Sequence, residues 1–93
     1  MKIKDGFEMT QVNKDYYLVK AVGPRAEEFP QTIQLGFSGA FLWDQLSKGD
    51  YTVTELVLKL DHLFEADTPV EQLTRDVETF VNFLKQYDLL ESE

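Results

Sequence analysis

The spacing of apolar residues changes at Gly36, and this change constrains the fold more than any other feature of the chain. Before Gly36, apolar and polar residues tend to alternate, which is typical of strands that bury one face. After it, apolar residues recur every three or four positions, as they do on amphipathic helices. The sequence therefore predicts an α+β fold in which a small sheet precedes a set of helices.

Three strands are predicted before this point, over residues 7–12, 16–22 and 32–35. Residues 13–15, Asn-Lys-Asp, are typical of a turn, so the first two strands should form an antiparallel hairpin. Residues 23–31 are expected to form a polar loop bounded by prolines, with one exposed aromatic side chain, Phe29. In the short third strand, Ile33 and Leu35 should face the core.

Three helices are predicted after the strands, over residues 38–48, 53–65 and 69–87. Ser38 is the expected N-cap of the first helix. Thr52 opens the second helix with a capping-box pattern, and Thr68 repeats that pattern before the third, where Pro69 would take the first helical position. We expect one domain over residues 1–93, winged-helix-like, with a three-stranded antiparallel sheet followed by three helices.

The charge of the chain argues against nucleic-acid binding. Nine Lys and Arg face 17 Asp and Glu, which leaves a net charge of −8 with the single His neutral, and the cations are scattered along the chain. Such a chain repels a phosphate backbone. No apolar run approaches the roughly 20 residues of a membrane span, and the first residues lack the apolar region of a signal peptide. We therefore expect a cytoplasmic protein that binds neither nucleic acid nor membranes.

The residues that usually carry catalysis or hold metals are sparse in this chain. Cysteine is absent, which removes disulfides, thiol catalysis and cysteine-based zinc sites. His62 is the only imidazole, and one His beside Asp61 and Glu65 makes a poor metal site, so a surface histidine is the expected interpretation. No Ser/His/Asp set, phosphate loop or catalytic carboxylate pair is found. We expect no catalytic activity, no cofactor and no metal.

The last predicted helix has a wider apolar stripe than one packing face requires. At 100° per residue, five positions lie within roughly 100° of one another: Leu73, Val77, Phe80, Val81 and Leu84. Phe83 and Tyr87 widen the arc to roughly 160°. Two interpretations stay open: these aromatics cover the rim of the core, or Phe80, Phe83 and Tyr87 wall a groove whose floor is the free edge of residues 32–35.

Residues 35–43, Leu-Gly-Phe-Ser-Gly-Ala-Phe-Leu-Trp, resemble the L-N-x-x-G-A-x-I-W segment of the PqqD family. Three later segments are also similar to motifs of that family: Leu46–Gly49, residues 51–56 and residues 76–90. Gly36 stands where the family usually has Asn, and Asp88 where it often has Gly. Within the first segment we expect Trp43 to anchor the core and Gly39 to allow close approach of the helix to the sheet.

The resemblance, which extends from about Phe7 to Leu90, implies a RiPP recognition element. Such a module binds the leader segment of a ribosomally made precursor peptide and presents it to a modifying enzyme, often a radical-SAM enzyme. In the family the leader adds a strand beside the third strand, in a groove walled by the third helix. The peptide-binding residues expected here are Thr32, Ile33, Gln34, Leu35, Asp76, Phe80, Phe83 and Tyr87.

Charged residues on the last helix have two interpretations each. Asp76 would pair with a basic leader residue or remain a solvated or locally bonded carboxylate, and Arg75 and Lys85 would meet acidic leader residues or only solvent. Two other functions also stay open. The topology allows a winged-helix DNA-binding regulator, which the charge opposes, and the exposed sheet edge allows a structural module that forms a homodimer.

Overall fold

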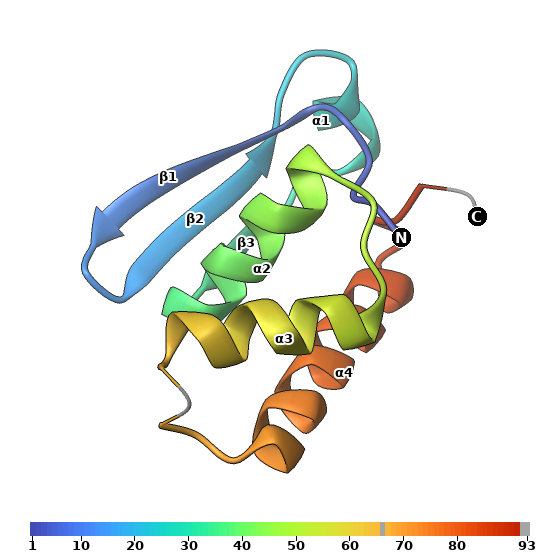
Figure 1. Cartoon of the computed structure of the whole chain (residues 1–93). Coiled ribbons are helices and arrows are strands. Elements are labelled where there is room, and N and C mark those ends of the chain that lie inside the picture. Colours follow the sequence, from blue (N-terminus) through green and yellow to red (C-terminus); the bar gives the residue numbers. More distant parts are fainter. Residues whose placement is uncertain (66, 92–93) are drawn as a thin grey trace.

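The computed structural model describes residues 1–65 and 67–91. The strands are β1 (Phe7–Asn13), β2 (Tyr16–Ala21) and β3 (Thr32–Leu35), and the helices are α1 (Arg25–Glu28), α2 (Phe37–Lys48), α3 (Val53–Leu63) and α4 (Val70–Gln86). An antiparallel three-stranded sheet thus precedes the three longer helices, which confirms the predicted fold class (Figure 1).

The sheet has the order β1-β2-β3, so β2 is central and the other two strands are edges. Both pairings are antiparallel, with Phe7 opposite Ala21 in one and Tyr17 opposite Leu35 in the other. The β1–β2 connection is a tight turn in which the Asp15 backbone N–H donates to the Asn13 side chain at 3.0 Å. This bond confirms the turn chemistry predicted for the hairpin.

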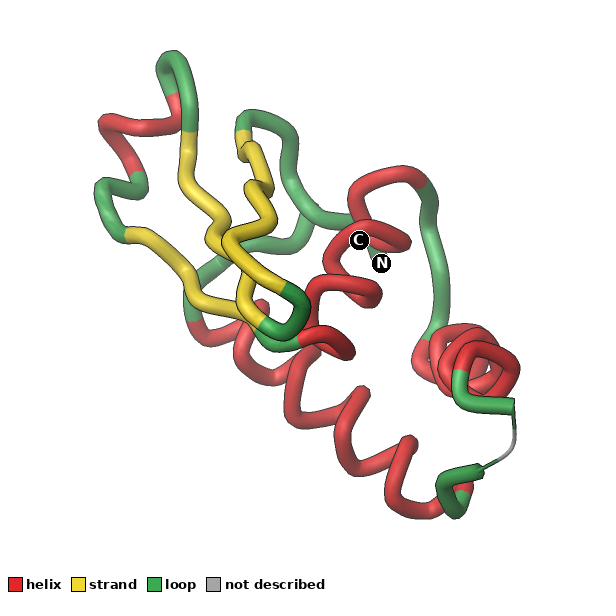
Figure 2. Tube along the Cα trace, turned by 90° about the vertical axis from the view of Figure 1, so that its left-hand side faces the viewer, coloured by secondary structure: helices red, strands yellow, loops and turns green. Residues whose placement is uncertain are grey.

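The core forms where the three longer helices meet the sheet, and Figure 2 shows these helices lying to one side of the strands. Val19 and Ile33 supply the sheet side, while each long helix contributes a buried stripe: Leu42, Trp43 and Leu46 from α2, Leu56, Val57 and Leu60 from α3, and Leu73, Val77, Val81 and Leu84 from α4. Trp43 is 2% exposed and anchors the core, as predicted. No polar side chain is buried within the described residues.

The beginning and the end of the described chain lie together (Figure 1). Ile3 forms a β-bridge with Leu90, and the Lys4 backbone N–H donates to the Leu89 carbonyl at 2.9 Å. The chain reaches this bridge because Asp88 adopts a left-handed conformation with φ 55°. Aspartate tolerates this conformation better than most residues, which explains how it can occupy a position where the family often has Gly.

The loop between β2 and β3 differs from the prediction. Residues 25–28 form the short helix α1, and Phe29 is half-buried, not exposed. The Phe29 ring packs edge-on against Phe7 and Tyr87, with centroid distances of 5.8 Å and 6.3 Å. Burial of the ring against two distant aromatics therefore holds this loop against the body of the domain.

Two of the three predicted N-caps are wrong. Helix α2 begins at Phe37 with Gly36 as its N-cap, so Ser38 already lies inside the helix. Helix α4 begins at Val70 because Pro69, at ψ 137°, is still extended, and Thr68 therefore stands one position too early to cap it. The capping box of Thr52 is confirmed. The Glu55 N–H donates to Thr52 Oγ1 at 3.2 Å, and the Thr52 N–H donates to Glu55 Oε1 at 2.9 Å.

Helix ends also differ from the predicted ranges by one or two residues. Helix α3 ends at Leu63 because Glu65 adopts a left-handed conformation with φ 53°. Helix α4 ends at Gln86, before the left-handed Asp88. Asn13 belongs to β1, since it pairs with Tyr16 after a register shift that follows Gln11.

Candidate functional site

The outer side of β3 is an unpaired strand edge. β3 pairs with β2, and among the described residues no backbone hydrogen bond joins residues 32–35 to another segment. Ile33 is 6% exposed and Leu35 is half-buried, as the alternation predicts, whereas Thr32 and Gln34 are exposed. The edge therefore combines main-chain groups open to a partner with side chains that are anchored in the core.

Helix α4 lies beside this edge because its buried stripe fixes its orientation. Leu73, Val77 and Leu84 are no more than 1% exposed, and Phe80 is 9% exposed. The next aromatics around the helix are partly accessible. Phe83 is half-buried, Tyr87 is 40% exposed, and their ring centroids are 5.0 Å apart. Around the circumference of α4, Phe80 is the last residue of the buried stripe on the side of β3. Phe83 and Tyr87, which lie beyond it, form a wall beside β3.

Two adjoining hollows lie between the edge and this wall. The larger, about 330 Å³, is lined by Gln34 and Leu35 of β3, by Ser38, Gly39 and Leu42 of α2, and by Asp76, Thr79, Phe80 and Phe83 of α4. The smaller, about 160 Å³, is lined by Phe29, Gln31, Thr32, Ile33, Gln34, Phe83 and Tyr87. Gln34 and Phe83 line both hollows, so the two form one depression along β3, called here the β3–α4 groove.

Gly39 shapes the bottom of the larger hollow. A Cβ atom at this position would lie 3.3 Å from Leu35 Cδ2, closer than ordinary van der Waals contact. Glycine therefore lets α2 approach β3 closely, as the sequence predicts, and it leaves open space that a larger side chain would fill.

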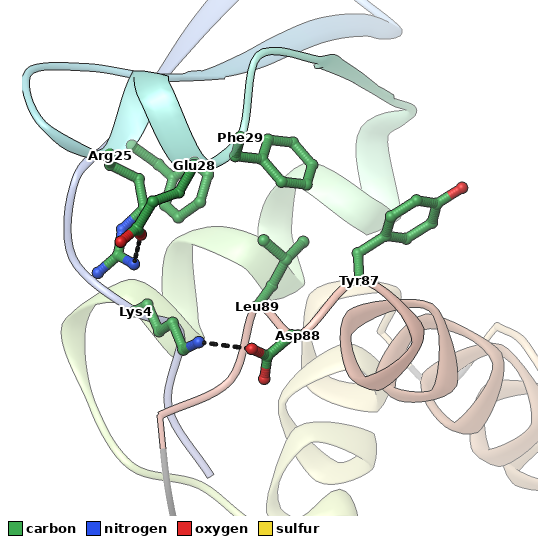
Figure 3. A pocket seen from close by; sticks show the side chains of 8 residues that line it. Lys4, Arg25, Glu28, Phe29, Tyr87, Asp88 and Leu89 are labelled. Atoms are coloured by element: carbon green, nitrogen blue, oxygen red, sulfur yellow. Dashed lines mark hydrogen bonds and ion pairs between the residues drawn. The ribbon is translucent and has the colours of Figure 1, made fainter.

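A third, polar hollow of about 210 Å³ adjoins the groove beyond Phe29 and Tyr87, which also line it (Figure 3). Two ion pairs stand on its walls. Lys4 Nζ lies 3.0 Å from Asp88 Oδ2, and Arg25 Nη1 lies 2.6 Å from Glu28 Oε2. The cationic side chains are 27% and 29% exposed, and their acidic partners are largely in solvent, so the ion pairs are only weakly stabilising.

Two of the three charged residues considered on α4, Asp76 and Arg75, form hydrogen bonds with a residue of the same helix. Asp76 lines the larger hollow, and its Oδ1 accepts a hydrogen bond from Gln72 Nε2 at 2.8 Å. Arg75 Nη2 donates to Gln72 Oε1 at 3.0 Å, and Lys85 is exposed. Asp76 is thus both locally bonded and positioned at the groove.

All eight residues that the sequence proposed for peptide binding line the β3–α4 groove. Two of them, Ile33 and Phe80, are largely buried and form its floor and inner wall. Sequence reasoning missed six lining residues: Phe29, Gln31, Ser38, Gly39, Leu42 and Thr79. The signal in the sequence that could have found part of this lining is Phe29, a lone aromatic in an acidic loop.

The remaining candidate groups lie elsewhere or do not gather. His62 is exposed on α3, as expected. Within residues 1–65 and 67–91, no three His, Asp or Glu side chains are close enough together to hold a metal ion. None of the helices seen in these residues has the length and apolarity needed to cross a membrane.

The fold and the groove together define a small α+β domain with an open sheet edge beside an aromatic helix wall. The chain belongs to the PqqD family, because the family described as Coenzyme PQQ synthesis protein D (PqqD) matches residues 26–90. That match includes β3 and the three long helices and begins after β1 and β2. A comparison with curated proteins gives no match.

The fold is also similar to a solved structure that includes the whole domain. This structure is described as "TbiB1 in Complex with the TbiA(beta) Leader Peptide". The two chains are 22% identical, with a TM-score of 0.71, and the alignment covers 100% of this chain and 98% of the other. β1 and β2, which the family match leaves out, are therefore part of a fold already seen in another protein.

Proposed function

We propose that this chain is a RiPP recognition element, a non-catalytic adaptor that captures the leader segment of a ribosomally made precursor peptide. The leader adds a strand to the outer edge of β3 and places side chains in the β3–α4 groove. The observation that carries the proposal is the unpaired edge of residues 32–35 beside the wall of Phe83 and Tyr87. Two findings support the proposal. The chain belongs to the PqqD family, and its fold is similar to that of a protein solved in complex with a leader peptide.

Two kinds of contact would act in the groove, one that supplies binding affinity and one that supplies selectivity among peptides. Main-chain hydrogen bonds along four residues of β3 would each contribute about 0.5–1.5 kcal/mol, whatever the leader sequence. Apolar leader side chains in the two hollows would supply selectivity, because each buries surface against Phe83, Leu35 or Phe29. Exposed charges such as Asp76 would add only ~0–1 kcal/mol each.

The partners of the adaptor follow from this role. A captured leader is useful only if the adaptor presents the rest of the precursor to a modifying enzyme, for which a radical-SAM enzyme is our first candidate. Such an adaptor would act in the cytoplasm, where precursors are made. No observation favours a DNA-binding regulator: the net charge is −8, and Lys4 and Arg25, two cations that the fold brings to one hollow, are each paired with a carboxylate.

An NMR titration with the cognate leader tests the proposal. The leader is taken from a small precursor gene beside this gene, and a scrambled leader of the same composition is the control. We expect the cognate leader to move the backbone amide signals of residues 32–35 and 71–87, and the scrambled one to leave them in place. Signals that do not move at high micromolar leader would contradict the groove hypothesis.

A further inference from the structure

A second apolar surface lies between α2 and α3, on a side of α2 adjacent to the one that faces the sheet edge. We call it the α2–α3 face. It carries a hollow of about 350 Å³ lined by Phe41, Gln45, Leu58, Lys59, His62 and Leu63. Leu58 is 64% exposed and Leu63 36%, and Phe37, at 45%, extends the surface along α2. Three of the six exposed large hydrophobic side chains in the described residues therefore gather here.

The α2–α3 face does not overlap the β3–α4 groove, although the two share a helix. Ser38, Gly39 and Leu42 of α2 line the groove, whereas Phe41 and Gln45 line the face. With a rotation of 100° per residue, these two sets point about a quarter turn apart around α2. A peptide in the groove and a protein on the face could therefore be bound at the same time, on adjacent sides of one helix.

The one charged side chain that lines this hollow is basic, in contrast to the acidic chain as a whole. The ionisable lining residues are Lys59 and His62, in a chain of net charge −8. Lys59 Nζ stands 4.6 Å from the centre of the Tyr51 ring, which holds the ammonium beside the face. Two carboxylates of the same helices have local partners, since Glu55 accepts the Thr52 N–H and Asp44 pairs with Lys48.

These charges decide which occupant fits best. In a symmetric dimer the face would meet itself, so the interface would hold two copies of Lys59 and no lining carboxylate, and two chains of −8 would be joined. A partner with apolar side chains flanked by carboxylates would instead complement both the apolar lining and the basic groups. We propose that the α2–α3 face docks such an apolar, carboxylate-bearing segment of a partner protein. That this partner protein is the modifying enzyme is an inference that rests on the proposed function.

A defined helical probe tests this docking surface. The probe is a synthetic amphipathic helix with a leucine row, two glutamates flanking that row and glutamine elsewhere, and its matched partner has lysine in place of the two glutamates. We expect the glutamate probe to move the amide signals of residues 41–45 and 58–63 and to leave residues 32–35 unmoved. The lysine probe should bind this face more weakly.

Matched variants locate the binding. Leu58→Asp should weaken binding of the glutamate probe by about tenfold or more. Val70→Asp is the control and should not weaken binding, because Val70 is 55% exposed at the start of α4, outside the α2–α3 face. Equal binding of both probes at the face, or probe signals confined to residues 32–35, would overturn the proposal. A dimeric mass in light scattering that Leu58→Asp reduces to a monomer would assign the face to a second copy and overturn it as well.

The leader peptide separates this proposal from the proposed function. Leu58→Asp should keep the leader affinity of the parent chain, because Leu58 lies outside the groove. If Leu58→Asp weakened leader binding as strongly as probe binding, the two surfaces would not be independent, and the docking proposal would fail. A leader that does not bind the parent chain, while the probe still maps to the α2–α3 face, would count against the proposed function alone.

Discussion

β1 and β3 are the two edges of one sheet, and β3 is the edge that lies beside the wall of helix α4. β1 has seven residues and β3 has four, so length alone would favour β1 for strand addition. Four consecutive residues of β1, from Thr10 to Asn13, are exposed, and the β1 register shifts between Gln11 and Asn13. Such irregularities are one means by which proteins make an edge a poor template for pairing.

The comparison shows what an edge needs in order to be selective. Main-chain groups at either edge can pair with any extended segment, because every residue except proline offers the same N–H and C=O. Within the described part of the chain, β3 combines these groups with two hollows, since α4 places Phe83 and Tyr87 beside it and α2 places Gly39 beneath it. The short edge is thus the one at which the side chains of an added strand would be distinguished.

The largest expected effect comes from placing a charge in the wall beside β3. Phe83 lines both hollows and is half-buried, so Phe83→Asp should weaken leader binding by about tenfold or more while leaving the fold largely intact. Val12→Asp on β1, where the side chain is 55% exposed, should leave the affinity unchanged. Isothermal titration calorimetry measures both, and circular dichroism checks the fold. Unfolding of Phe83→Asp would instead assign Phe83 to the core.

A smaller effect is expected when the larger hollow is filled from below. Gly39→Leu places a side chain in the space that Leu35 and Phe83 line, so leader binding should weaken several-fold, on the order of 1 kcal/mol. Gly36→Leu is the matched control. A Cβ there would lie 3.9 Å from its nearest neighbour, an ordinary contact outside the groove, so the affinity should be unchanged. Equal loss in both variants would indicate that any bulk added near the start of α2 disturbs the domain.

A third, weaker effect concerns charge at the groove. Asp76→Asn should reduce affinity for a leader with a basic residue by no more than about fivefold, because exposed ion pairs contribute ~0–1 kcal/mol. The loss should diminish in high salt, and Glu78→Gln on the exposed side of the same helix should cause none. If Asp76→Asn changes nothing at low salt, Asp76 serves only the hydrogen bond from Gln72.

The smallest effect on binding is expected from the helix caps, which separate fold stability from the groove. Thr52→Ala should lower the free energy of unfolding by about 1 kcal/mol, because it removes a capping box. Thr68→Ala should change it little, since no side chain caps α4. Chemical denaturation measures both, and neither change should alter leader affinity. A larger loss in Thr68→Ala than in Thr52→Ala would contradict the cap assignment.

The features that the sequence predicted are those fixed by local pattern. The change of period at Gly36 separated sheet from helices, and the Thr52 pattern located a helix start that the structure confirms. The width of the apolar arc left two interpretations of Phe83 and Tyr87 open, the rim of the core or the wall of a groove, and both side chains line the β3–α4 groove.

The features that were missed depend on contacts between distant segments. A helix of four residues, such as α1, is too short to have a period, and the burial of Phe29 depends on Phe7 and Tyr87. The Thr68 pattern had the right residues, but the extended Pro69 moved the helix start by one position. Gly39 was expected to bring α2 close to the sheet, but its place in the groove followed only from how α2 packs on β3.

The most direct measurement is of nuclear Overhauser contacts between the backbone protons of a bound leader and those of the sheet. We predict contacts from the leader to residues 32–35 of β3, with side-chain contacts to Phe83, and none to residues 8–12 of β1. Strand addition at β3 would be contradicted if, with the protein saturated by leader, the backbone contacts of the leader lie along β1 or involve neither edge.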